Sequence, residues 1–157
     1  MPEKKRKPLI MHNAENKKIK NASPLEYDGI AFKSKLEKMI YQILKENGFP
    51  VEYEPHKFVI WEGFRPTIPF YNKDKITRML KLEKKKIIDI TYTPDFVFIY
   101  NGYLVVIEAK GFENDSFYLK KKMFRKWLEG HYPKSIYFEI YTKKQLLQAV
   151  EIIKALN

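Results

Sequence analysis

The sequence feature that most constrains the fold is a β-hairpin at residues 96–107. Two runs of β-branched and aromatic residues, 96–100 and 103–107, are separated by Asn101 and Gly102. Asn-Gly favours a two-residue type I′ turn, because both central residues of that turn need positive φ. Such a turn fixes the register, so that the numbers of paired residues sum to 203. Continued past the apolar runs, the register places Asp95 opposite Glu108 on one face of the hairpin.

Lys110 shares that face, because side chains alternate along a strand and Lys110 lies two residues beyond Glu108. Two opposed carboxylates repel each other unless something compensates their charge. A divalent cation would do so, and two carboxylates completed by water and phosphate oxygens suit Mg²⁺, with Mn²⁺ as a substitute. The cation would promote hydrolysis of a phosphate ester, while Lys110 would position the attacking water or hold the phosphate. The alternative is an ordinary strand end, in which Asp95 caps a turn and Glu108 and Lys110 face solvent.

The charge of the chain bears on its partner. Among 157 residues, 30 are Lys or Arg and 19 are Asp or Glu, which gives a net charge of +11 and a pI of about 9.6. This charge favours a polyanion such as nucleic acid, although solubility explains it equally well. The absence of cysteine excludes disulfides, thiolate zinc sites and cysteine catalysis. No apolar run approaches the ~20 residues of a membrane span, so we expect no membrane partner and a cytoplasmic protein.

The remaining pattern predicts further helices and strands around the hairpin. We expect helices over 35–47, 116–129 and 143–156, and strands over 51–60 and 136–141. Ser34 with Glu37, and Thr142 with Gln145, have the spacing of capping boxes. Gly48 and Gly130 are the expected ends of the first two helices. The predicted buried stripe of the first helix consists of Leu36, Met39, Ile40, Ile43 and Leu44. The order of elements predicts an α/β fold with a mixed sheet.

Composition also divides the chain. Residues 1–25 are rich in lysine and poor in large apolar residues, and we expect them to be a flexible basic N-terminal arm. Residues 26–157 form the predicted domain. Within it, residues 61–86 are interpreted as an insertion, where 74–86 form either a helix or a charged hairpin.

Two short segments resemble the halves of the PD-(D/E)xK nuclease motif. They are Tyr-Thr-Pro-Asp-Phe at 92–96 and Ile-Glu-Ala-Lys-Gly at 107–111. The predicted elements also resemble the restriction-endonuclease-like α-β-β-β-α-β core of that superfamily, a mixed sheet flanked by helices. The resemblance implies a metal-dependent endodeoxyribonuclease, in which Asp95 and Glu108 bind Mg²⁺ and Lys110 is catalytic.

Residues 32–37 and 51–54 are similar to the start of the phage endonuclease I family, which resolves four-way (Holliday) junctions. The resemblance places a first-helix glutamate of the active site on Glu37, as a further metal ligand and catalytic residue, and a second glutamate on Glu52. It implies branched DNA as the substrate, and the host cytoplasm if the chain is phage-encoded. Family members are strand-exchanged dimers, but their bridge between halves is not recognisable here, so a homodimer stays open. Segments 26–32, 108–112 and 118–122 are also similar to a phage-borne family of undefined function.

Basic side chains next to the predicted site are the expected DNA contacts. Such contacts position the phosphate backbone without reading sequence, whereas the alternative is a solvated helix face. The set consists of Lys33, Lys35, Lys120, Lys121, Lys122, Arg125 and Lys126. The histidines lack the spacing of a zinc site.

Two other functions stay open at this point. One is a non-cleaving nucleic-acid-binding protein that keeps a nuclease-like fold, and the other is a nuclease subunit of a transposition or restriction system. The acidic pair beside a lysine favours cleavage over pure binding, because carboxylates that face phosphates do not strengthen the binding of nucleic acid.

Overall fold

A four-stranded mixed sheet forms the centre of the computed structural model, which describes residues 25–111 and 115–157. The predicted N-terminal arm therefore lies, but for its last residue, outside the described residues. The sheet order is β10 (Ser135–Ile140), β9 (Tyr103–Ala109), β8 (Phe96–Tyr100) and β3 (Glu52–Tyr53). Strand β9 runs parallel to β10 and antiparallel to β8, and β3 is antiparallel to β8. The predicted α/β fold with a mixed sheet is confirmed.

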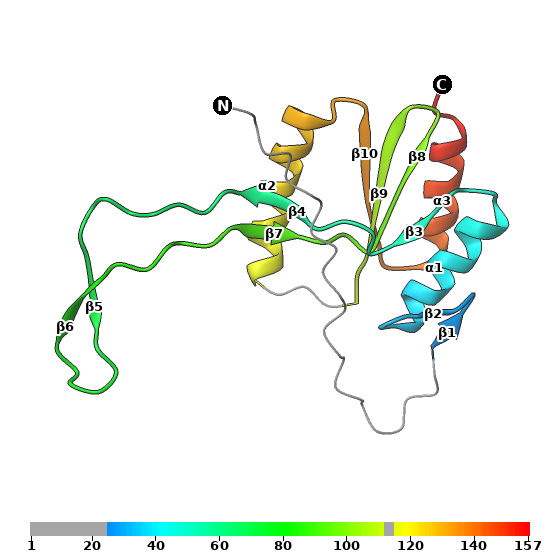
Figure 1. The fold of residues 1–157 in the computed structure, drawn as a ribbon. Helices are drawn as coiled ribbons and strands as arrows, with labels where there is room; N and C mark the ends of the chain where they lie inside the picture. Colours follow the sequence, from blue (N-terminus) through cyan, green and yellow to red (C-terminus); the bar gives the residue numbers. More distant parts are fainter. Residues whose placement is uncertain (1–24, 112–114) are drawn as a thin grey trace, which may run out of the picture.

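Helices cover both faces of this sheet (Figure 1). Helices α1 (Lys35–Glu46) and α3 (Lys143–Lys154) pack on one face, and α2 (Asp115–His131) packs on the other together with β4 (Phe58–Trp61) and β7 (Ile90–Tyr92). Side-chain alternation along β8 and β9 produces the two cores. The core shared with α1 and α3 contains Phe96, Phe98, Val105 and Ile107, and the core shared with α2 contains Val97, Leu104 and Val106.

The hairpin of β8 and β9 has the predicted register. Its five pairs run from Tyr100↔Tyr103 to Phe96↔Ile107, and each pair sums to 203. The turn residues Asn101 and Gly102 have φ of 46° and 79°, as a type I′ turn requires. Asp95 and Glu108 are the next positions beyond the last pair.

The helix ends match the sequence in part. Gly48, with φ of 77°, follows α1, and the capping box of Thr142 and Gln145 begins α3. Gly130 does not end α2, so that prediction is wrong. The helix continues to His131, whose ring stacks on Trp127 with 4.2 Å between centroids and stabilises the last turn.

Helix α1 is rotated relative to the predicted stripe. Its buried residues are Glu37, Ile40, Tyr41 and Leu44, whereas Leu36, Met39 and Ile43 are half-buried. Ser34 caps the helix by accepting from the Glu37 N–H group at 3.1 Å, but the Glu37 carboxylate accepts from the Lys33 N–H group, one residue earlier than in a capping box. The predicted box is therefore half-formed, and Glu37 lies on the buried face.

The predicted strand over 51–60 is split, and the segment after it, predicted to be an insertion, forms a two-stranded ribbon. Glu54 has φ of 45° and precedes Pro55, so the chain breaks there between β3 and β4. Residues 62–89 then form what we call the projecting ribbon, which contains β5 (Phe70–Lys73) and β6 (Leu80–Glu83) and extends away from the sheet (Figure 1). Of the two predicted alternatives for 74–86, the hairpin is confirmed and the helix is wrong. A second small hairpin, β1 (Glu26–Tyr27) with β2 (Ile30–Ala31), precedes α1.

Gly63 is required where the ribbon leaves the domain. A Cβ atom there would lie 2.2 Å from the Ile87 carbonyl oxygen, and the Gly63 N–H group donates to Asp89 at 2.7 Å. We expect Gly63→Ala to separate the two strands and to raise hydrogen exchange of the Ile87 amide, now bonded to the Phe64 carbonyl, by about tenfold or more. Gly130→Ala is the matched control, because a Cβ atom meets nothing within 4 Å there. Unchanged exchange in Gly63→Ala would contradict the close approach.

Candidate active site

Glu108 is the buried centre of the candidate site, with 6% of its surface exposed. One carboxylate oxygen accepts from the Tyr92 hydroxyl at 2.6 Å, and the other accepts from Lys110 Nζ at 2.6 Å. Tyr92 comes from β7, and the other two residues come from the end of β9. Hydrogen bonds from two separate segments of the chain thus meet at one carboxylate, which fixes its orientation.

Asp95 lies directly before β8 and beside Glu108. Its Oδ2 atom accepts from the Ala109 N–H group at 2.7 Å, and its carbonyl accepts from the Glu54 N–H group at 2.7 Å. Burial, followed by the negative charge of Glu108, raises the pKa of Asp95 to about 8, although the Ala109 bond and the Lys110 charge oppose this shift. The two acids of neighbouring strands therefore lie close enough to repel each other.

Lys110 is enclosed, with 11% of its side chain exposed. Its ammonium group lies 3.3 Å from the ring centroid of Phe117 in α2 and bonds to Glu108 on its other side. The alternative of solvent-facing Glu108 and Lys110 is therefore wrong. The start of α2 covers this side of the site, and a cation over an aromatic ring is a favourable contact.

Glu37 is buried near the acidic pair but has its own partners. Its carboxylate accepts from the Tyr53 hydroxyl at 2.6 Å, from the Ser34 hydroxyl at 2.9 Å and from the Lys33 N–H group at 3.1 Å. Its charge also contributes to the raised pKa of Asp95. Within 25–111 and 115–157, no group of three His, Asp or Glu side chains is close enough to hold a metal ion. Glu37, Asp95 and Glu108 are thus neighbours, but they do not form a closed set of three ligands.

Two tyrosines and a glutamate that were not predicted as site residues also lie around Glu108. The hydroxyls of Tyr92 and Tyr137 lie 3.1 Å apart. Burial, together with the charge of Glu108, raises the pKa of both phenols, so both stay protonated. Glu139 of β10 pairs with Glu108 across the parallel strands. The parallel pairing of β10 with β9 brings Tyr137 and Glu139 to the site, whereas Tyr92 reaches it from β7.

The basic side chains divide into paired and exposed ones. Lys121 forms an ion pair with Glu139 at 2.8 Å, and Lys33 forms one with Glu54, so both predicted DNA contacts are already held by carboxylates. Lys120 is half-buried. The exposed members of the predicted set are Lys35, Lys122, Arg125 and Lys126. Glu52 is exposed on β3.

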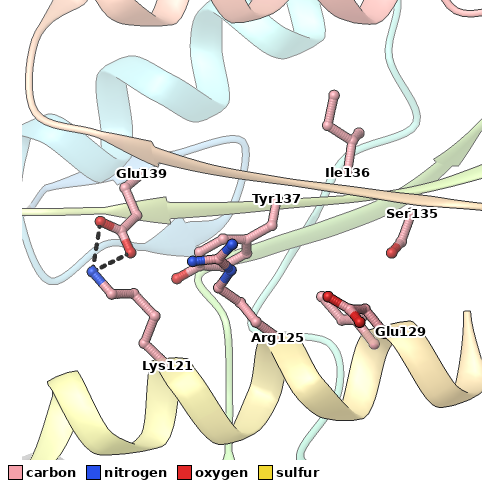
Figure 2. A pocket seen from close by; sticks show the side chains of 8 residues that line it. Lys121, Arg125, Glu129, Ser135, Ile136, Tyr137 and Glu139 are labelled. Carbon is pink, nitrogen blue, oxygen red and sulfur yellow. Dashed lines mark hydrogen bonds and ion pairs between the residues drawn. The ribbon is translucent and has the colours of Figure 1, made fainter. Parts of the chain in front are cut away.

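A hollow of about 520 Å³ separates α2 from β10 and borders the site. Lys121 and Arg125 line it from α2, and Tyr137 and Glu139 line it from β10 (Figure 2). Because the Tyr137 hydroxyl also contacts the Tyr92 hydroxyl, the hollow lies beside the hydrogen bonds that hold Glu108. None of the helices in the described part of the chain has the length and apolarity of a membrane span.

The fold and the site define an α/β protein whose mixed sheet carries a largely buried acidic pair, the buried Glu108 and the half-buried Asp95, beside a lysine. The chain belongs to the family described as Protein of unknown function (DUF1064), whose profile matches residues 17–144. Neither the curated proteins nor the solved structures contain a significant match to it.

Proposed function

We propose that the protein is a metal-dependent endodeoxyribonuclease of the PD-(D/E)xK type that hydrolyses phosphodiesters of DNA, with branched DNA such as a Holliday junction as its substrate. The observation that carries the proposal is the placement of Asp95 and Glu108 at adjacent strand positions with Lys110 beside them. A structural role alone does not explain a buried and a half-buried carboxylate that repel each other, since such an arrangement destabilises the fold.

The donor set fits a hard divalent cation. Mg²⁺ commonly takes one or two protein carboxylates and fills its remaining positions with water and substrate phosphate, so Asp95 and Glu108 suffice. The raised pKa of Asp95 means that Lys110 does not fully compensate the negative charge of the pair, so a bound cation would be favourable there. When bound, a cation there would supply electrostatic stabilisation of charge that develops on the phosphate.

The residues around the pair have roles that follow from their contacts. The protonated Tyr92 hydroxyl holds Glu108 in one orientation, and Tyr137 supports Tyr92. Lys110 brings one positive charge to the pair, and by turning from Glu108 it would hold a phosphate oxygen or the attacking water. Glu37 adds negative charge from α1 and supports cation binding without closing the ligand set.

A cleavage assay on three DNA substrates tests this proposal. Purified protein is incubated with linear duplex, single-stranded DNA and a four-way junction, in Mg²⁺ or in EDTA. We expect cutting in Mg²⁺ only, with the junction cut fastest, and we expect Lys110→Met to reduce the rate by about a hundredfold or more. Lys154→Met is the matched control, because this lysine is exposed near the end of α3 and belongs neither to the acidic pair nor to the expected DNA contacts.

The outcomes separate the alternatives. Tight binding of DNA without cutting in either metal would favour a non-cleaving nucleic-acid-binding protein. Cleavage in EDTA, or equal loss of activity in both lysine variants, would exclude the proposed site.

A further inference from the structure

We infer that the projecting ribbon, residues 62–89, binds duplex DNA and directs it to the acidic pair. The inference rests on the proposed function in that DNA is taken as the partner, but the ribbon itself is a surface separate from the site. Figure 1 shows it extending from the α2 side of the sheet, away from α1 and α3.

The ribbon is an ordered two-stranded structure. Strands β4 and β7 pair at its base, Phe64 pairs with Ile87 beyond them, and β5 pairs with β6 from Phe70↔Glu83 to Lys73↔Leu80. The turn at its tip is closed by Asp74, whose side chain accepts from the N–H groups of Ile76 and Thr77 at 3.0 Å and 2.8 Å. A defined shape that stands in solvent suits a binding element better than a linker.

Aliphatic side chains along the ribbon are exposed to a degree that is unusual for a monomeric surface. Ile68 is 81% exposed, Ile76 is 91% exposed and Leu80 is 76% exposed. Exposed apolar patches of this kind mark interaction sites. These side chains contribute nothing to either core of the domain, which favours a partner that covers them.

The charge of the ribbon selects the kind of partner. Residues 62–89 contain eight Lys or Arg and four Asp or Glu. Two ribbons from two copies of the chain would bring like charges together, which disfavours self-association through this surface. A phosphate backbone has the complementary charge, and its binding gains from the release of counterions.

The dimensions and side chains of the ribbon suit a DNA groove. A two-stranded β-ribbon fits the major groove, and aliphatic side chains such as Ile and Met also act as wedges in the minor groove. At roughly 3.3 Å per residue, the four-residue strands β5 and β6 each span about 13 Å, close to the ~12 Å width of the major groove. Basic side chains at both strands would then contact phosphates while the aliphatic ones contact bases.

The base of the ribbon connects it to the site. Its returning strand β7 ends at Tyr92, whose hydroxyl bonds to Glu108, and the chain reaches Asp95 three residues later. DNA bound along the ribbon would therefore lie close to the acidic pair. A strained duplex could shift β7, and with it the Tyr92 hydroxyl that holds Glu108.

Variants that remove positive charge from the ribbon test this inference without relying on cleavage. The binding of a labelled 30-bp duplex is measured by fluorescence anisotropy in EDTA over a series of salt concentrations. We expect Lys84→Gln/Lys85→Gln/Lys86→Gln to weaken binding by about tenfold or more and to reduce the salt slope by about three. Lys143→Gln/Lys144→Gln/Lys154→Gln makes the same charge change on the exposed surface of α3 and should weaken binding by less than about twofold.

A second variant tests the aliphatic contacts. Ile76→Ser/Leu80→Ser keeps the charge, and we expect it to weaken duplex binding by about fivefold with an unchanged salt slope. Equal effects of the two lysine triples, or loss of a dimer in sedimentation with DNA binding intact, would overturn the inference. If the wild type binds through the ribbon but does not cut in Mg²⁺, the proposed nuclease fails and the ribbon inference stands; if it cuts DNA and the ribbon variants bind normally, only the ribbon inference fails.

Discussion

Asp95→Asn is expected to reduce Mg²⁺-dependent DNA cleavage by about a thousandfold or more while leaving the protein folded. The amide oxygen of asparagine still accepts from the Ala109 N–H group, so the contact at 2.7 Å is kept. What is lost is a negative charge next to Glu108, and with it half of the proposed cation site. The rate is measured on the junction substrate at saturating Mg²⁺, and folding is checked by circular dichroism and thermal unfolding.

Glu151→Gln is the matched control for this variant. It removes one negative charge from an exposed position on α3, which packs on the opposite face of the sheet from α2. We expect its cleavage rate to stay within about threefold of the wild type. A rate for Asp95→Asn above a tenth of the wild-type rate would show that the acidic pair is not where catalysis occurs.

The sequence predicts the centre of the site because that part depends on local structure. A two-residue Asn-Gly turn sets the register of β8 and β9, and strand alternation then places Lys110 with Glu108. Asp95 follows from the same register, since it lies one position beyond the last pair. A short-range rule thus gives three of the candidate residues without knowledge of the rest of the fold.

The remaining residues of the site depend on contacts that no short-range rule gives. Tyr137 and Glu139 reach the site only because β10 pairs in parallel with β9, and no turn sets the register of a parallel pair. Tyr92 returns from the projecting ribbon, about thirty positions after the chain left the sheet. The sequence predicted an insertion over 61–86, but not that Tyr92 after it would donate a hydrogen bond to Glu108.

Glu37 shows how one residue can meet a local and a distant requirement at once. The capping-box spacing explained it locally, and the structure confirms that its N–H group bonds to Ser34. Its carboxylate, however, accepts from Tyr53 of the neighbouring strand β3, and α1 is rotated so that Glu37 is buried. Burial of Tyr41 in place of Met39 accounts for this rotation, because an aromatic ring that packs on Phe32 fills more of the space beneath the helix.

In the absence of a divalent cation, the protein is expected to become less stable as pH rises from about 4 to about 8. Burial and the charge of Glu108 raise the pKa of Asp95 from about 3.8 to about 8 in the folded state. Between these values the folded protein holds a proton that the unfolded chain has released, so unfolding becomes more favourable with each step of pH. Above about 8 the carboxyl is ionised in both states and the effect levels off. The loss should amount to a few kcal/mol, read from urea unfolding in EDTA at pH 5.5, 7.0 and 8.5.

Asp95→Asn isolates this contribution from the other ionisable groups of the protein. Because asparagine does not titrate, the variant should be more stable than the wild type at pH 8.5, and the difference should shrink at pH 5.5.

Mn²⁺ or Mg²⁺ should stabilise the wild type at pH 8.5 by about 2.7 kcal/mol when its concentration is about a hundred times Kd, and should leave the variant nearly unchanged. A difference between the two proteins that is the same at all three pH values would contradict the raised pKa. Equal stabilisation of both by the cation would show that the ion binds away from the acidic pair, since only the wild type carries both carboxylates.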